Sequence, residues 1–520
     1  MVNGRNLVSR RTFLAGTSLA AVAGYAGRSW AADGPKTAAA PAIVRAPAGV
    51  LRGETFAGVR MFRGIPFCET PAGALRFRPP MKLAPWEGEH DATRFKASAM
   101  QAGEPGIAHS EDCLGLNIWA PTSGGPHPVF VWIHGGGFTA GHAFDAGLDG
   151  AQFARVGVVV VTVPYRLGIF GFLDVSPLLG SSYAGSANNA VKDLIASLQW
   201  IRENISAFGG DPDRVTVGGE SAGGKLTCTL MGVPSAQPLF HQMISSSGGA
   251  ERVWTTEQAA FVAGRFGDVW KKTGRDLQSL ATAPATELAD AQKQLLADWP
   301  KDLPMQIPLR PEIDGEFFPR TPIETIAAGS TRGKRFLVGT NLDESAAFIG
   351  AHPKEVTQSN VGNLALARFN EIYSHYKSLY PDLSDEQLRI RAVSAQAYWV
   401  PSVRVADAHA KAAGNTWMYR LDFAESSGRL QGYAFHGLDV PLVWNKPHKD
   451  VTNAGAETKL STQMHQAWVA FIRGEAPAAP GLPAWPEYKP ETRDTMLLTG
   501  ESRVERKPHE AELRLWDGVL

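Results

Sequence analysis

The chain has 520 residues, and its 51 basic side chains balance its 51 acidic side chains, so it carries no net charge at pH 7. This length allows one large core or several smaller domains. Balanced charge excludes the strong electrostatic field with which proteins attract nucleic acid or an anionic membrane. We therefore expect a small-molecule partner and no nucleic acid, while the oligomeric state is left open.

The beginning of the chain has the pattern of an export signal. Arg10 and Arg11 precede an apolar stretch that runs to about Ala26 and is too short and too rich in glycine to span a membrane. We expect residues 1–31 to be a twin-arginine signal peptide and residues 32–48, rich in Ala and Pro, to be a flexible connector. The chain has no second long apolar run and no lipid-anchor tail. The sequence thus predicts export to the periplasm or the medium without a stable membrane anchor.

The cysteine pattern argues against structural crosslinks and metals. Cys68, Cys113 and Cys228 are an odd number, so at least one thiol stays unpaired. Their spacing matches no zinc motif, and the chain has no HExxH pair. We expect neither a disulfide framework nor a metal or other cofactor.

Apolar runs of strand length alternate with helical patterns along the chain. Unbroken runs of this kind are typical of parallel strands that are covered on both faces, and four of them occupy 129–134, 158–163, 214–219 and 335–340. Residues 191–205 repeat apolar side chains at helical spacing and predict a crossover helix. The pattern favours an α/β fold with a large, mostly parallel sheet and helices on both faces. In such sheets, reactive groups gather beyond the carboxyl ends of the strands.

One short motif at such a strand end predicts a nucleophile. Gly219, Ser221 and Gly223 satisfy G-x-S-x-G, the nucleophile elbow of α/β-hydrolases. The motif is common by chance, but residues 215–217 supply a strand before it and residues 225–231 a helix after it. The glycines suit a strained turn in which neighbouring β-carbons would collide. We therefore predict that Ser221 is a catalytic nucleophile.

A second glycine-rich motif predicts an oxyanion hole. Residues 134–138, HGGGF, directly follow an apolar strand, as in lipases and esterases. The backbone N–H groups of Gly136 and Gly137, together with that of Ala222, are the expected donors to a substrate oxyanion. A phosphate cradle is the alternative, but no Gly-Lys-Ser/Thr follows the motif and no G-x-G-x-x-G opens a helix. His134 is expected to position this loop.

Longer segments extend these motifs over nearly the whole chain. They read FRGIPFCETPAGALRFRPP at 62–80, SEDCLGLNIWAP at 110–121, VWIHGGGF at 131–138, NISAFGGDPDRVTVGGESAGG at 204–224 and FLVGTNLDES at 336–345. Together these blocks resemble the type-B carboxylesterases, a family that includes para-nitrobenzyl esterases and cholinesterases. The resemblance implies the α/β-hydrolase fold and serine-dependent hydrolysis of carboxylic esters.

The same resemblance assigns the two partners of the serine, which the fold places in the order Ser, acid, His. The family's triad acid falls on Glu344, although from chemistry alone the adjacent Asp343 is equally able to orient an imidazole. The family's His-Gly motif falls on His436 and Gly437. Ser247 matches a serine that hydrogen-bonds the acid in relatives, and it is a supporting residue only.

Three positions depart from the family pattern. Cys113 stands where many relatives form a disulfide, but the partner position falls near Met100, so we expect no disulfide there. Residues 164–166 read Pro-Tyr-Arg in place of Asn-Tyr-Arg, and Ser345 replaces a glycine after the triad acid. Neither of these last two changes touches the expected chemistry.

We expect residues 49–520 to form one hydrolase domain, in which helical insertions at about 250–310 and 345–400 make a lid-like region. In the expected mechanism His436 takes the Ser221 proton and an acyl-enzyme forms, which water then hydrolyses. Because the imidazole must be neutral, activity is expected to fall below its ordinary pKa of about 6.5.

Two alternatives to an ester hydrolase remain. One is an acyl hydrolase that uses the same residues on a carbamate, a lactone or an amide. The other is a catalytically inert binding or adhesion protein, because a protein can keep a fold after it has lost the catalytic activity. The presence of serine, glutamate and histidine in their expected motifs argues against the second alternative.

Overall fold

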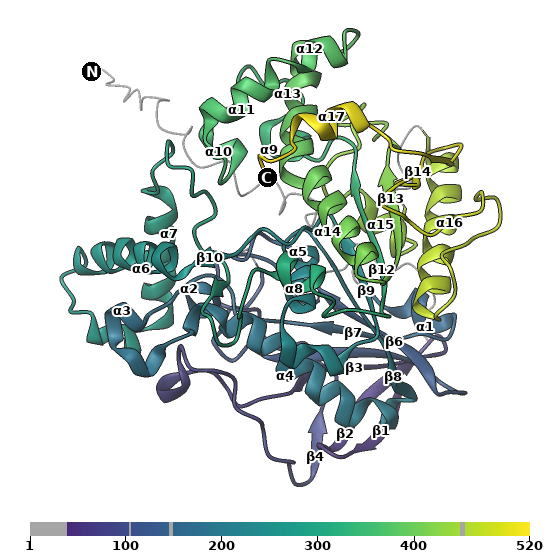
Figure 1. The fold of residues 1–520 in the computed structure, drawn as a ribbon. Helices are drawn as coiled ribbons and strands as arrows, with labels where there is room; N and C mark the ends of the chain where they lie inside the picture. Colours follow the sequence, from purple (N-terminus) through teal and green to yellow (C-terminus); the bar gives the residue numbers. More distant parts are fainter. Residues whose placement is uncertain (1–38, 103–105, 145–148, 448–452) are drawn as a thin grey trace, which may run out of the picture.

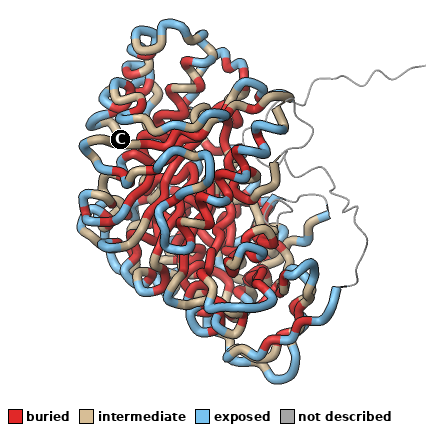
Figure 2. Tube along the Cα trace, turned by 90° about the vertical axis from the view of Figure 1, so that its right-hand side faces the viewer, coloured by how far each residue is buried: buried red, intermediate tan, exposed pale blue. Residues whose placement is uncertain are grey.

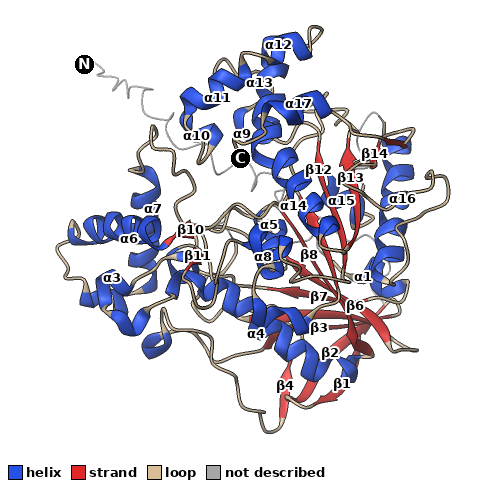
Figure 3. Ribbon diagram, viewed as in Figure 1, coloured by secondary structure: helices blue, strands red, loops and turns tan. Residues whose placement is uncertain are grey.

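The computed structural model describes residues 39–102, 106–144, 149–447 and 453–520. The predicted signal peptide, residues 1–31, lies outside the described residues. The described chain is built around one large twisted sheet with helices on both of its faces (Figures 1 and 3). Thirteen strands make up this sheet in the described residues, in the order β1-β2-β3-β5-β7-β6-β8-β9-β12-β13-β14-β15, with β4 paired to β2.

The strands of the large sheet are β1 (Ala40–Ala46), β2 (Gly49–Phe56), β3 (Val59–Pro66), β4 (Glu89–Asp91), β5 (Gly115–Pro121), β6 (His127–Ile133), β7 (Val159–Val163), β8 (Gly210–Glu220), β9 (Gln242–Ser246), β12 (Arg335–Asn341), β13 (Asn415–Leu421), β14 (Thr495–Leu498) and β15 (Arg503–Glu505). A separate small sheet pairs β10 (Trp254–Thr255) with β11 (Glu312–Ile313).

The centre of the sheet is parallel, as the apolar runs predict. Strands β7, β6, β8, β9, β12, β13 and β14 are parallel neighbours. The antiparallel pairs lie toward the two edges, from β1 to β7 on one side and between β14 and β15 on the other. The four predicted strands are confirmed as β6, β7, β8 and β12, all within the parallel part.

Alternate residues of the central strands enter two separate cores. In β6, Val129, Val131 and Ile133 pack on one face of the sheet, whereas Phe130 and Trp132 pack on the other. Successive side chains of a strand point to opposite faces, so a strand that is covered twice must be apolar at every position. Figure 2 shows the resulting buried centre running through the molecule.

The helices are α1 (Ala151–Arg155), α2 (Ile169–Phe172), α3 (Ser176–Leu179), α4 (Asn189–Asn204), α5 (Ala222–Met231), α6 (Thr256–Lys271), α7 (Ala285–Ala297), α8 (Pro322–Ala327), α9 (Ala346–Ile349), α10 (Gln358–Val361), α11 (Leu366–Tyr373), α12 (Tyr376–Leu379), α13 (Asp385–Ser394), α14 (Val400–Lys411), α15 (Asp439–Val443), α16 (Ala454–Ile472) and α17 (Glu510–Leu515). Helices α4 and α5 contribute to the core on one face, and α16 contributes to the core on the other.

Several helices coincide with segments that the sequence pattern indicates. The predicted crossover helix is α4, which connects β7 to β8, while β6 lies between those two strands in the sheet. Helices α6 and α7 fall in the first predicted insertion, and α9 to α13 fall in the second. Among the described residues, each helix is too short or too polar to cross a membrane.

The flexible connector predicted at 32–48 is wrong for its second half. Residues 40–46 form β1, which pairs with β2 along its full length. Ala42 and Val44 point inward and are buried, while Pro41, Ile43 and Arg45 are exposed. The prediction weighed the Ala and Pro content and overlooked this alternation, which is the pattern of an edge strand. Residues 32–38 lie outside the described part.

A buried ion pair ties the loop after β7 to helix α4. Arg166 donates from Nε and Nη2 to the two carboxylate oxygens of Asp193 at 2.8 and 2.7 Å. Its backbone N–H donates to the same carboxylate at 3.1 Å, and Nη1 donates to the carbonyl oxygen of Arg78. The exposed fractions of the two side chains are 3% and 0%. A buried charge of this kind is costly once its partner is removed.

Replacing Asp193 with alanine therefore leaves the charge of Arg166 buried without a carboxylate partner. We expect Asp193→Ala to lower the free energy of unfolding by about 3–5 kcal/mol, measured from urea denaturation curves. The matched control is Glu371→Ala, because Glu371 pairs with Arg368 on the exposed side of α11, where an ion pair contributes less than about 1 kcal/mol. Equal losses in the two variants would contradict this account.

Candidate active site

The predicted site residues come together at the carboxyl edge of the parallel strands. Ser221 directly follows β8, Ser247 directly follows β9, and Glu344 lies in the turn after β12. His436 lies between β13 and α15. Neighbouring parallel strands end at the same edge of a sheet, so residues far apart in sequence meet here.

The turn at Ser221 is a strained strand-to-helix elbow. Ser221 has φ 56° and ψ −120°, a backbone conformation that residues other than glycine rarely adopt. A β-carbon on Gly219 would lie 2.5 Å from the carbonyl oxygen of Ile133, and one on Gly223 would lie closer still. Both glycines are therefore required for the elbow to pack against β6. The side chain of Ser221 stays partly accessible at the start of α5.

Glu344 and His436 are in direct contact. Glu344 Oε2 lies 2.5 Å from His436 Nδ1, and both side chains are almost fully buried. The other carboxylate oxygen, Oε1, accepts hydrogen bonds from Ser247 Oγ at 2.6 Å and from the backbone N–H of Asn341 at 2.8 Å. The carboxylate is thus held by three donors, with one of its oxygens directed at the imidazole.

Asp343, the competing carboxylate, points elsewhere. Its Oδ2 accepts a hydrogen bond from the backbone N–H of Ala434 at 3.2 Å, and its Oδ1 lies 3.7 Å from Arg391 Nη2. The backbone of Asp343 also donates to the carbonyl oxygen of Ala434. Asp343 therefore anchors the segment before His436 and makes no hydrogen bond to the imidazole.

The second nitrogen of the imidazole faces another acid. His436 Nε2 lies 3.1 Å from Oε1 of Glu220, the residue immediately before Ser221. Ser221 Oγ makes no hydrogen bond within the described part of the chain, so the structure brings the histidine and the acid together but does not join the serine to them. Contacts between a nucleophile and its base are often long until a substrate binds.

Two aromatic rings enclose the imidazole. The ring centroids of Phe348 and Tyr398 lie 4.9 and 4.8 Å from that of His436. Phe348 comes from α9, and Tyr398 comes from a π-helical turn, Ala395–Trp399, between α13 and α14. Both belong to the second predicted insertion, which therefore reaches the site. The rings restrict the orientation of the imidazole and exclude water from its faces.

The acids around His436 determine its charge. Burial alone would lower the pKa of His436, but the carboxylates of Glu220 and Glu344 outweigh burial and raise it. Burial raises the pKa of Glu220, and the neighbouring imidazole opposes that rise. The imidazole thus holds a proton more tightly than a free histidine does.

The glycine-rich loop after β6 presents backbone donors next to the elbow. Gly136 and Gly137 have φ of 112° and 62°, which glycine adopts without strain. Their N–H groups donate to no acceptor within the described residues. Ala222 is the first residue of α5, so its N–H also has no partner inside the helix. The three predicted oxyanion donors are thus free to bind a ligand atom.

His134, at the start of this loop, is held in place by contacts with neighbouring residues. Its ring stacks on Tyr165 with centroids 4.4 Å apart, and its Nδ1 lies 2.8 Å from the carbonyl oxygen of Gly135. Tyr165 donates a hydrogen bond to the carbonyl oxygen of His134 at 2.9 Å. Burial lowers the pKa of His134 to about 3, so the ring is neutral at physiological pH. Its predicted role of positioning the loop fits these contacts.

Sequence reasoning missed three residues that touch His436, namely Glu220, Phe348 and Tyr398. Glu220 is the first variable position of the G-x-S-x-G motif, so its place beside the nucleophile was visible in the sequence. The two aromatic residues lie in the insertion at 345–400, where no local pattern distinguishes a ring that faces the site from one that faces the core.

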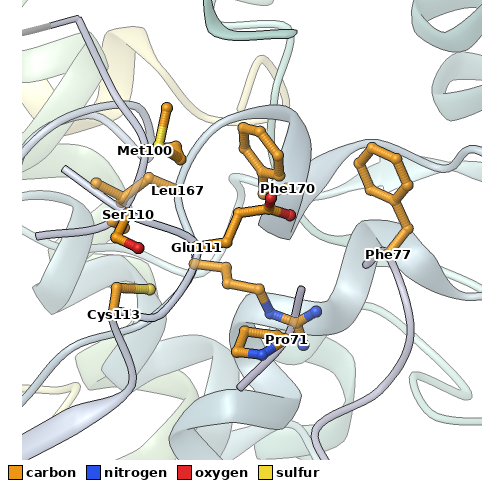
Figure 4. A pocket seen from close by; sticks show the side chains of 10 residues that line it. Pro71, Phe77, Met100, Ser110, Glu111, Cys113, Leu167 and Phe170 are labelled. Atoms are coloured by element: carbon orange, nitrogen blue, oxygen red, sulfur yellow. The ribbon is translucent and has the colours of Figure 1, made fainter. Parts of the chain in front are cut away.

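The cysteines lie away from this chemistry. All three have free thiols and are buried. Cys113 and Met100 line the same small pocket, with Pro71 and Phe77 among the other lining residues (Figure 4). A methionine thus accompanies Cys113 in place of a second cysteine, and burial raises the pKa of the Cys113 thiol to about 12. At neutral pH this thiol stays protonated and unreactive.

Known proteins resemble this chain over almost its whole length. The Carboxylesterase family profile matches residues 40–516. The para-nitrobenzyl esterase of Bacillus subtilis is 35% identical over 491 residues, which cover 91% of this chain and 97% of that protein.

Solved structures agree. A para-nitrobenzyl esterase structure has a TM-score of 0.80 at 34% identity, and a carboxylesterase of Geobacillus stearothermophilus has 0.81 at 33%. Each alignment covers 91% of this chain and 99% of the other. The sheet has the topology of the α/β-hydrolases, as predicted. The chain therefore belongs to the carboxylesterase family and is a carboxylic-ester hydrolase.

Proposed function

We propose that Ser221, His436 and Glu344 carry out the ester hydrolysis through an acyl-enzyme. The observation that carries this proposal is the 2.5 Å contact between Glu344 Oε2 and His436 Nδ1, at the sheet edge where the Ser221 elbow ends β8. That contact leaves Nε2 as the imidazole nitrogen that takes the proton of Ser221. Glu344 fixes the tautomer and stabilises the imidazolium without accepting the proton.

The reaction runs in two halves. Ser221 Oγ attacks the ester carbonyl carbon while His436 takes its proton, and the imidazolium then protonates the departing alcohol. Water attacks the acyl-enzyme with His436 again acting as base, which releases the acid and restores Ser221. In both halves the negative charge that develops on the carbonyl oxygen is stabilised by the N–H groups of Gly136, Gly137 and Ala222.

The remaining expectations complete this proposal. The substrate is a small-molecule ester, and residues 40–520, which include strand β1, act as one domain in which the two helical insertions border the site. The twin-arginine pattern at residues 1–31 favours export to the periplasm or the medium. Ser247 supports the site by holding the carboxylate of Glu344.

Removing the nucleophile is the direct test. We expect Ser221→Ala to lower kcat for para-nitrophenyl acetate by about 10⁴–10⁶-fold, because the acyl-enzyme cannot form. An organophosphate should lose its leaving group and add the mass of its phosphoryl group to the Ser221 peptide of the wild type, but not to the corresponding peptide of Ser221→Ala. The control is Ser206→Ala, an exposed serine, which should leave both measurements unchanged. A Ser221→Ala protein with wild-type turnover would exclude the assignment, and a wild type that hydrolyses no ester would indicate the inert binding protein.

A paired substitution separates the two adjacent acids. We expect Glu344→Gln to lower kcat by about 10³–10⁴-fold, because the amide cannot stabilise the imidazolium or fix its tautomer. Asp343→Asn should lower kcat by less than about tenfold, since Asp343 only anchors the Ala434 segment. Steady-state kinetics on one ester decide between them, and a larger loss in Asp343→Asn would reverse the assignment.

The carboxylates around His436 also determine the pH dependence. The base must be neutral, and its pKa is raised, so kcat/KM should fall as the pH decreases through a midpoint above the ordinary imidazole value of about 6.5. This midpoint is higher than the one that the sequence alone predicts. Glu220→Gln removes an acid that favours the imidazolium, so the acid limb of kcat/KM should move to lower pH. Glu371→Gln, on the exposed side of α11, is the control. A limb that stays in place in Glu220→Gln would contradict this interpretation.

A further inference from the structure

Three buried or nearly buried cations lie together beside the nucleophile. We call Lys225, Arg252 and Arg310 the basic cluster. Lys225 is on α5, one helical turn after Ser221, and is only 6% exposed. The side chain of Arg252 is 10% exposed, and Arg310 is completely buried. None of the three has a role in the mechanism proposed above.

The cluster contains a single acid among its described contacts. Glu251 Oε1 lies 3.4 Å from Lys225 Nζ and 3.2 Å from Arg252 Nε. In the part of the chain that the structure describes, Arg310 has no carboxylate partner and donates instead to the carbonyl oxygens of Ile307 and Gln306 and to the side-chain oxygen of Asn363. Three positive charges thus have one negative charge in direct contact, while Glu220 is close enough to interact electrostatically with Lys225. Buried charges are normally paired, because leaving them uncompensated is costly.

Of the three cations, Arg252 has the largest number of unused hydrogen-bond donors. Apart from its ion-pair contact with Glu251, its guanidinium donates no hydrogen bond within the described residues, although it carries five N–H groups. A β-carbon on Gly362 would lie 2.9 Å from Arg252 Nη1, so a glycine leaves room for this head group. An arginine held in this way has the geometry to bind a carboxylate with two parallel hydrogen bonds.

The cluster is close enough to act on a bound ester. The ring of Tyr398 has Lys225 Nζ 5.1 Å from its centroid and the His436 ring 4.8 Å from it. Lys225 is therefore within about 10 Å of the imidazole. Its ammonium also donates to the carbonyl oxygen of Gly248 at 2.6 Å, next to the serine that holds Glu344. Ser221, Glu251 and Tyr398 are all partly exposed.

The electrostatics agree with an excess of positive charge. Burial lowers the pKa of Lys225, and Glu251 only partly offsets this effect. Burial likewise lowers the pKa of Arg310, and the neighbouring Arg252 adds to the shift. Both cations would gain from an additional anion in the cluster.

We propose that the site prefers esters that carry a second, ionised carboxylate, which binds Arg252 and Lys225 while the ester carbonyl lies at Ser221. This inference rests on the proposed function and adds a substrate class to it, the partial esters of dicarboxylic acids and related anionic esters. Glu251 holds the two cations in place and limits their combined charge.

The test compares esters that differ in charge. Monomethyl esters of succinic, glutaric and adipic acid place the anion on the acyl side, and each is compared with its dimethyl ester. The pair 4-acetoxybutanoate and 4-acetoxybutanamide places the anion on the alcohol side. We expect the wild type to show a kcat/KM for the anionic member at least about tenfold above that for its neutral partner in at least one series. A ratio at or below one in every series would overturn the proposal.

Variants then locate the preference. Arg252→Met should lower the anionic-to-neutral ratio at least about tenfold, and Arg252→Lys should retain more of it. Glu251→Gln should raise the ratio, because it removes the acid that competes with the substrate. Arg404→Met, on the exposed side of α14, removes a surface charge and should leave the ratio unchanged. If Arg252→Met does not fold, Glu251→Gln decides, and an unchanged or lower ratio in that variant overturns the proposal.

Hydrolysis of para-nitrophenyl acetate distinguishes a failure of the proposed mechanism from a failure of the proposed charge preference. A wild type that hydrolyses this neutral ester through Ser221 but shows no charge preference refutes the basic cluster as a specificity site and leaves the proposed mechanism intact. A wild type that hydrolyses neither kind of ester refutes both.

Discussion

The geometry of the site depends on one backbone contact, where the elbow at Ser221 rests on the carbonyl oxygen of Ile133. Glycines on both sides of the serine allow β8 and β6 to approach this closely at their carboxyl ends. Ile133 ends β6, and the glycine-rich loop begins at the next residue. The nucleophile and the oxyanion donors are therefore placed relative to each other by the pairing of two strands. A larger side chain at Gly219 or Gly223 would separate both parts at once.

The fold determines which elements supply the acidic and the basic side chains near the imidazole. The ends of β8 and β12 supply the acids Glu220 and Glu344, which hold His436 from both of its nitrogens. The loop after β9 and the helix after Ser221 supply the cations Arg252 and Lys225. The ring of Tyr398 lies against both Lys225 and the imidazole that the acids hold. A substrate that reaches from one group to the other therefore meets a steep change in potential across the site.

The sequence predicted the parts of this molecule that local chemistry determines. Central strands, the crossover helix and the elbow each have a short-range pattern, because burial on two faces or a strained turn restricts which residues fit. Local chemistry left Glu344 and Asp343 equal, since adjacent carboxylates have the same chemistry and differ only in direction, and only the family resemblance favoured Glu344. Strand β1 was missed because its alternation lies in an Ala/Pro-rich segment. Phe348, Tyr398 and the basic cluster depend on contacts between insertions and the sheet, which no window of sequence records.

The π-helical turn at Ala395–Trp399 has a consequence for how this site can change through evolution. An extra residue in a helix shifts the direction of every side chain beyond it by about 100°. Here α14 packs against β12 and β13, while Tyr398 within the turn lies beside the imidazole. Deletion of one residue from this turn would leave an ordinary α-helix, in which only one of these two contacts could be kept. The aromatic wall of the site thus depends on the length of this turn as well as on the amino acid at position 398.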